Sequence, residues 1–122
     1  MIEHELDTVN SILYVRPKTS LEQTDFAELA RTVDPHIEKG GDLAGLIIDA
    51  PRFPGWEGFG AAAAHFRFVR DHQKHIRKIG LVTDSALGNV AEHLVSHFLS
   101  AEVRHFPAGE LEAAKQWVIG QS

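Results

Sequence analysis

The sequence predicts one α/β domain over residues 1–122, with a mainly parallel, five-stranded mixed sheet and four helices in the order ββαβαβαβα. Two observations predict this fold class. Strand-like and helix-like segments alternate from Ser11 onward, which is typical of right-handed crossover units. Two strand segments, "LAGLIIDA" and "KIGLVTD", lack polar alternation, which indicates burial on both faces of a sheet. A chain of 122 residues fits one hydrophobic core.

The first elements are two strands and a helix. "IEHEL" and "SILYVR" are β-rich runs separated by the turn "DTVN", so they are expected to pair antiparallel. A helix follows, with Thr24 or Asp25 as its cap and Gly40 or Gly41 at its end. Pro35 is expected to kink or restart this helix, because proline lacks the amide hydrogen. Its apolar stripe consists of Phe26, Leu29, Ala30, Val33 and Ile37.

The later elements alternate strand and helix. After "LAGLIIDA" and a loop comes a long helix, whose expected core stripe is Phe59, Ala62, Ala63, Phe66, Val69 and Ile76. After "KIGLVTD" a helix is expected within residues 87–98, and after "EVRHF" a last helix begins near Pro107. If the strands follow chain order, all helices would lie on one face. The apolar strands then require either a reordered sheet or a second subunit over the other face.

Composition excludes several classes of function. The chain has no cysteine, so disulfides, thiol nucleophiles and zinc–thiolate sites are excluded, and a reducing, cytoplasmic location is expected. A net charge of −5 argues against nucleic acid as a partner. One segment is locally basic and is interpreted as a solvated helix flank, with an anion site as the alternative; its residues are Arg67, Arg70, Lys74, Arg77 and Lys78. No apolar run reaches the ~20 residues that stable membrane insertion requires.

The loop "PRFPGWEG" is the candidate ligand site. Ligands of parallel sheets bind beyond the carboxyl ends of the strands, where Asp49 and Asp84 are expected to share one rim. Aromatic side chains near polar groups suit an apolar ligand, which adds Phe53, Trp56 and Phe59 to the candidates. The alternative is that these rings only cover the edge of the core.

Catalytic, metal and cofactor motifs are weak. Neither GxSxG nor GxGxxG occurs, so we predict no catalytic residue and no cofactor. His93 and His97 lie one helical turn apart and could share a metal, but no third ligand is fixed, so no metal site is predicted. A second stripe on the long helix is instead predicted as a subunit interface. It consists of Ala61, Ala64, His65, Phe68, His72 and His75.

Three segments, "GLIIDAPRFPGWEGFGAAAAHFRFV", "HIRKIGLVTDS" and "EVRHFPAGELEAAKQWV", together resemble SpoIIAA-like domains of the STAS superfamily. The likeness is to an uncharacterised bacterial branch that is also related to CRAL-TRIO lipid-binding domains. It implies a compact α/β domain that binds partners or small ligands and is not an enzyme. In anti-sigma antagonists a phosphorylated serine follows the third strand, but "DAPRFPGWEGFG" contains neither serine nor threonine.

The expected function is therefore that of a non-catalytic regulatory or protein-interaction module that lacks the phosphorylatable serine and forms a homodimer. The alternative is a small-molecule or lipid carrier that uses the loop after the third strand.

Overall fold

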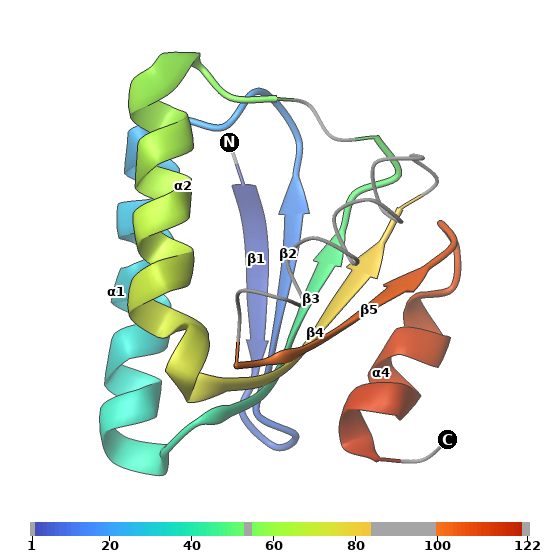
Figure 1. The fold of residues 1–122 in the computed structure, drawn as a ribbon. Helices are drawn as coiled ribbons and strands as arrows, with labels where there is room; N and C mark the ends of the chain where they lie inside the picture. The colour runs from blue at the N-terminus through green and yellow to red at the C-terminus, as the bar shows by residue number, and fades with distance from the viewer. Residues whose placement is uncertain (1, 53–54, 84–99, 121–122) are drawn as a thin grey trace.

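The computed structural model describes residues 2–52, 55–83 and 100–120. These residues form one five-stranded sheet in which spatial order follows chain order (Figure 1). The first pair of strands is antiparallel, as expected, and the other three pairings are parallel. Because the edge strand β1 runs antiparallel to β2, the sheet is mixed, and this replaces the expectation of a mainly parallel one. The strands are β1 (Ile2–Asp7), β2 (Ile12–Pro17), β3 (Leu43–Asp49), β4 (Ile76–Val82) and β5 (Glu102–Phe106).

Three α-helices lie within the described residues, instead of the four that were expected. They are α1 (Gln23–Gly40), α2 (Gly58–His72) and α4 (Leu111–Ile119). A short 3-10 turn, η1 (Gln73–His75), joins α2 to β4, so Ile76 opens a strand and does not belong to the helical stripe. The helix expected within residues 87–98 lies outside the described residues.

The start and the end of α1 are set by local chemistry. The backbone N–H of Glu22 donates to the Asp25 carboxylate at 2.8 Å, so Glu22 takes the capping position. The helix then continues through Pro35 as one element, and the expected restart is wrong. Gly41 closes it with φ +88°, a conformation that glycine adopts without strain.

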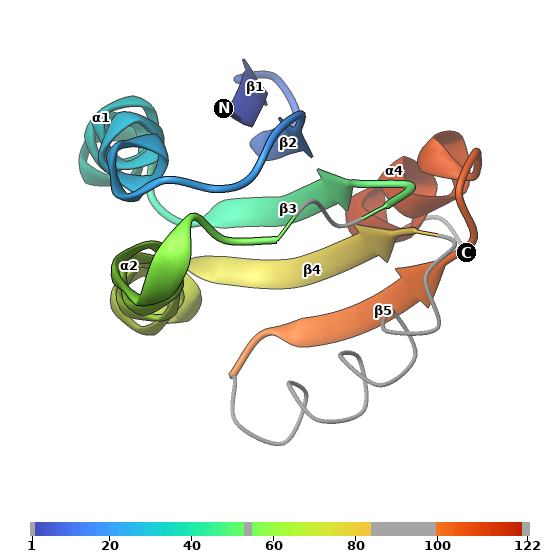
Figure 2. The ribbon, with the colours of Figure 1, turned by 90° about the horizontal axis from the view of Figure 1, so that it is seen from above.

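The helices cover both faces of the sheet. Figure 2 shows α1 and α2 on one face and α4 on the other. Because right-handed crossovers connect β2 to β3 and β3 to β4, α1 and α2 must share a face. Helix α4 connects no two of the five described strands, so the crossover rule does not fix its side, and it packs over β3, β4 and β5. Helix α4 thus covers part of the second face, and the strands keep chain order, so the reordered sheet that the sequence offered as an alternative is not found.

Two hydrophobic cores flank the central strands. Leu46 and Ile79 face α1 and α2, whereas Ile47 and Val82 face α4. This explains why the two strand segments lack polar residues, and the predicted burial on both faces is confirmed. The core under α4 is the smaller one; its buried residues are Ile12, Ile47, Val82, Phe106, Ala114 and Val118.

The inner and outer faces of α2 are the reverse of the prediction. Ala61 and Phe68 are only 1% and 9% exposed, although they were assigned to a subunit interface. Phe59 and Phe66 are 95% and 73% exposed, although they were assigned to the core. The reason is a tertiary contact. The ring centroids of Phe68 and of Phe26 on α1 are 6.1 Å apart, and this packing places the Phe68 side of α2 against the core.

Candidate functional site

The carboxyl ends of β2 and β3 meet at the predicted rim. Ile48 pairs with Leu81 in parallel register, which confirms adjacent, co-directional central strands. At the end of β3, Asp49 accepts a hydrogen bond of 3.3 Å from Nε of Arg16, and both side chains are partly exposed. Two other predicted rim residues, Phe53 and Asp84, lie outside the described residues.

The loop after β3 is fastened to the connector that precedes α1. The N–H of Leu21 donates to the Gly55 carbonyl at 2.8 Å, and the N–H of Glu57 donates to the Leu21 carbonyl at 2.7 Å. The side chain of Leu21 is buried, so this bridge is anchored in the core. Gly55 has φ +88°, which favours glycine at this turn. The second half of the loop is therefore held in place before α2 begins.

Trp56 ties the same loop to α2. Its indole N–H donates to Nδ1 of His65 at 3.0 Å, and the tryptophan remains 45% exposed. His65 also stacks on Phe26, with ring centroids 4.9 Å apart. Burial lowers the pKa of His65, which favours the neutral ring whose Nδ1 accepts this hydrogen bond. Trp56 thus presents one ring face at the surface from a fixed position.

A second group of apolar side chains stands on the outside of α2. We call it the outer stripe; Phe59 and Phe66 are its large members, and Ala63 between them is exposed. Because Phe59 is almost wholly exposed, it forms no wall of a pocket with Asp49. The outer stripe consists of Phe59, Ala62, Ala63, Phe66 and Val69.

The residues predicted as a subunit interface mostly make contacts inside the chain. Nε2 of His72 lies 2.7 Å from the Asp34 carboxylate, and Nδ1 of the same ring lies 2.8 Å from the Phe68 carbonyl oxygen. Nδ1 of His75 lies 2.9 Å from the Asp42 carboxylate. Ala64 packs against the larger core. These side chains join α2 and η1 to α1 and to the turn after it, so within the chain this face of the helix packs against α1.

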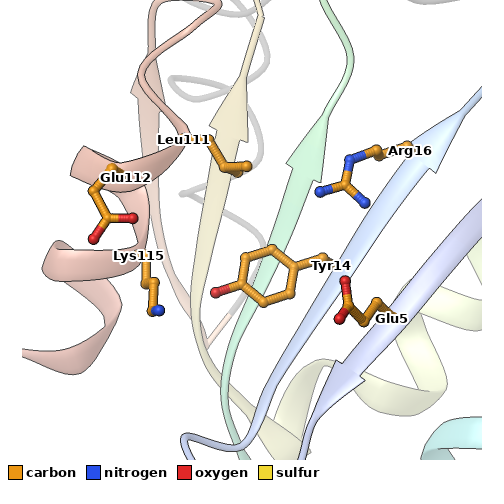
Figure 3. A pocket seen from close by; sticks show the side chains of 6 residues that line it. All are labelled: Glu5, Tyr14, Arg16, Leu111, Glu112 and Lys115. Carbon is orange, nitrogen blue, oxygen red and sulfur yellow. The ribbon is translucent and has the colours of Figure 1, made fainter.

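A cavity that the sequence did not reveal lies between α4 and the first two strands (Figure 3). Its volume is about 200 Å³, and Tyr14 occupies its middle. Burial raises the pKa of Tyr14, and the negative charges of Asp7, Glu112 and Glu5 act in the same direction. The lining residues are Glu5, Tyr14, Arg16, Leu111, Glu112 and Lys115.

The described part of the chain holds no group of three or more histidine, aspartate or glutamate side chains arranged to bind a metal. The candidate pair His93 and His97 lies outside it. Within the same residues, no helix combines the length and the apolar character needed to cross a bilayer.

Comparisons with known proteins agree with this fold. The family model described as SpoIIAA-like matches residues 12–119. An uncharacterised protein from Shewanella loihica, whose crystal structure has a SpoIIAA-like fold, superimposes with a TM-score of 0.76 at 16% identity. The alignment covers 97% of this chain and 92% of that one. No match is found among curated proteins. The chain belongs to the SpoIIAA-like family.

Proposed function

We propose that the chain is a non-catalytic protein-interaction module of the STAS type, and that two copies pair through the outer stripe of α2. The observation that carries this proposal is the exposure of Phe59 and Phe66 on one helix face. Two exposed aromatic rings in line are unusual on a monomer, because the apolar surface they leave in water favours association.

The spacing of the outer stripe suits a helix partner. Phe59 and Phe66 are seven residues apart, which is close to two helical turns, so their side chains lie on the same face. Only the small residues Ala62 and Ala63 stand between them on that side. Small residues let two helices approach closely while larger ones at either end interdigitate.

The occupant we propose is a second copy of this chain. In an antiparallel pair related by a two-fold axis near Ala63, each Phe59 lies beside the partner's Phe66. The same arrangement brings exposed Glu57, at the start of one helix, toward exposed Arg67 in the second half of the other. The surface is therefore complementary to itself in both shape and charge.

Regulation by phosphorylation is not part of this proposal. Residues 49–60, the segment that corresponds to the serine-bearing segment of anti-sigma antagonists, contain neither serine nor threonine. Glu57 immediately precedes α2 and places a fixed negative charge at the helix start, where the helix dipole stabilises it. Association of this chain would then depend on its concentration and not on a kinase.

The alternative of a carrier that uses the loop after β3 has less support. A ligand pocket needs concave apolar walls. Phe59 is 95% exposed, and the indole N–H of Trp56 is used by His65, so neither residue offers a ligand an enclosed apolar wall or a free donor.

Analytical ultracentrifugation tests the proposal. The full chain is expected to sediment as a dimer at micromolar concentrations, and Phe66→Ser is expected to sediment as a monomer with an unchanged circular dichroism spectrum. Val9→Ser is the matched control, because Val9 is 91% exposed on the distant β1–β2 turn. A monomeric wild-type chain, or a Phe66→Ser variant that remains dimeric, would overturn the proposed pairing.

A further inference from the structure

We infer that the cavity between α4 and the β1–β2 hairpin is a binding site for a small zwitterion with an apolar body, such as a free amino acid. This site lies on the face of the sheet opposite α2, so it is separate from the outer stripe. Three independent features support it: the way the cavity is formed, the polar groups left without partners in it, and the balance of its charges.

The cavity is formed by the short length of α4. This helix has nine residues and packs over β3, β4 and β5; on the same face it buries Ile12 of β2 but leaves Glu5, Tyr14 and Arg16 partly or fully exposed. Glu5 and Tyr14 are direct partners across the hairpin, so they form the floor together. Leu111, the first residue of α4, supplies an apolar wall. The fold therefore leaves a hollow of about 200 Å³ instead of a packed interface.

Several polar groups around this hollow have no partner within the described residues. The Tyr14 hydroxyl, the Glu5 carboxylate and the Lys115 ammonium make no hydrogen bond or ion pair there. Arg16 uses Nε to bind Asp49, and Figure 3 shows its guanidinium directed across the cavity toward Leu111. Polar groups that converge on a concave surface and lack internal partners are typical of a ligand site.

The charges of the cavity define the class of ligand. Arg16 and Lys115 are cationic, whereas Glu5 and Glu112 are anionic, so the lining has no net charge. A ligand with one charge would meet repulsion from half of these groups, whereas a zwitterion can satisfy both kinds. The guanidinium fork suits a carboxylate, and Glu5 suits an ammonium group.

Tyr14 adds both apolar contact and a donor. Its ring lies between the hairpin charges and those of α4 (Figure 3). A tyrosine phenol is protonated at neutral pH, and the raised pKa of Tyr14 favours the same form, so its hydroxyl can donate a hydrogen bond. Leu111 faces the apolar part of the ligand on the opposite side.

Ligand titration followed by NMR tests this inference. Tyr14 is the single tyrosine of the chain, so selective ring labelling gives one set of signals in the cavity. Titration of the full chain with L-phenylalanine is expected to shift these signals saturably. Phenylpropanoate, which lacks the ammonium group, and phenethylamine, which lacks the carboxylate, are each expected to bind about tenfold more weakly.

A matched pair of variants locates the site. Glu5→Gln is expected to weaken L-phenylalanine about tenfold, because a hydrogen bond to a charged group is lost. Glu3→Gln is the control, since Glu3 lies two residues earlier on the same strand and outside the cavity lining. The inference is overturned by the absence of saturable shifts, by equal binding of the three probes, or by equal effects of the two variants.

Discussion

The two faces of the sheet differ in how completely they are covered. Within the described residues, α1 and α2 lie over the first face, whereas the nine residues of α4 cover only part of the second. Helices α1 and α2 connect strands of the sheet, so right-handed crossovers fix their side, whereas α4 connects no two of the described strands. The difference indicates that the short length of α4 leaves room for a ligand on the second face.

The two faces also differ in how fully their polar side chains are hydrogen-bonded. On the first face, polar side chains are paired between elements: Nε2 of His4 lies 2.9 Å from the Thr32 hydroxyl, and His72 contacts Asp34. On the second face, Nζ of Lys78 donates to the Trp117 carbonyl at 2.8 Å, but Tyr14 and Lys115 remain without hydrogen-bond partners among the described residues. The first face therefore contributes mainly stability, and the second offers groups that a ligand can use.

The largest expected effect concerns the first face. Phe68→Ala is expected to lower the free energy of unfolding by about 3–5 kcal/mol, because it removes a buried ring and leaves a cavity beside Phe26. Phe66→Ala, two residues earlier, is expected to change the stability of the monomer by less than about 0.5 kcal/mol, because its ring is exposed. Urea unfolding followed by circular dichroism measures both.

This pair of variants tests which side of α2 is buried. Both should be measured at a concentration where the chain is monomeric, so that association through the outer stripe does not contribute. Equal losses, or a larger loss for Phe66→Ala, would show that α2 is turned the other way.

A smaller effect is expected where α4 meets the sheet. At Gly45, an added Cβ would overlap with Cγ1 of Val118, so Gly45→Ala is expected to cost about 1–3 kcal/mol by forcing α4 away from β3. At Gly80 on the neighbouring strand, the nearest atom is the Cβ of Ala114 at 3.5 Å, an ordinary contact. Gly80→Ala is therefore the control, with an expected change within about 0.5 kcal/mol in urea unfolding.

The outcome at Gly45 also bears on the cavity. Displacement of α4 would move Leu111 relative to Tyr14, so the tyrosine ring signal is expected to shift in Gly45→Ala and to stay in place in Gly80→Ala. A Gly45→Ala variant with wild-type stability and an unchanged tyrosine signal would show that α4 is not held against β3 as closely as described.

The centre of the fold could be predicted from sequence because its signal is local. Ile47 and its neighbours in β3 are apolar on both sides, and this pattern alone requires a buried strand. The faces of α2 could not be predicted in this way. Phe59 and Phe66 form one apolar stripe, and Ala61 and Phe68 form another, so periodicity offers two equal choices. The contact of Phe68 with Phe26, more than 40 positions earlier in the chain, decides between them.

The candidate sites show the same limit. The rim at Asp49 follows from strand direction, so it was predictable, although its partner Arg16 was not identified. The cavity needs two facts that no short motif contains: the pairing of Glu5 with Tyr14, and the position of α4 on the second face. The pairing of Glu5 with Tyr14 follows from the hairpin, which the sequence predicts. The position of α4 could not be predicted, because no crossover rule fixes its side of the sheet.

The smallest effect expected is a pH dependence confined to the first face. Because burial lowers the pKa of His65 in the folded chain, the unfolded chain binds a proton more readily there. Stability is therefore complete above the ordinary histidine pKa of about 6.5 and decreases as the pH falls below it. In the folded chain Nδ1 is protonated only at a lower pH, because its pKa is lowered, and this protonation removes the acceptor for the Trp56 N–H that ties the loop after β3 to α2.

Urea unfolding at a series of pH values between neutral and mildly acidic isolates this contribution. His65→Phe keeps a ring against Phe26 but cannot be protonated, so its stability is expected to fall less on acidification than that of the wild type. His75→Gln is the control, because His75 is exposed and pairs with Asp42 outside the core. If His65→Phe and the wild type lose stability in parallel, His65 is not the residue that couples folding to pH. Any loss of stability on acidification would then come from other histidines on the first face of the sheet, such as His4 and His72.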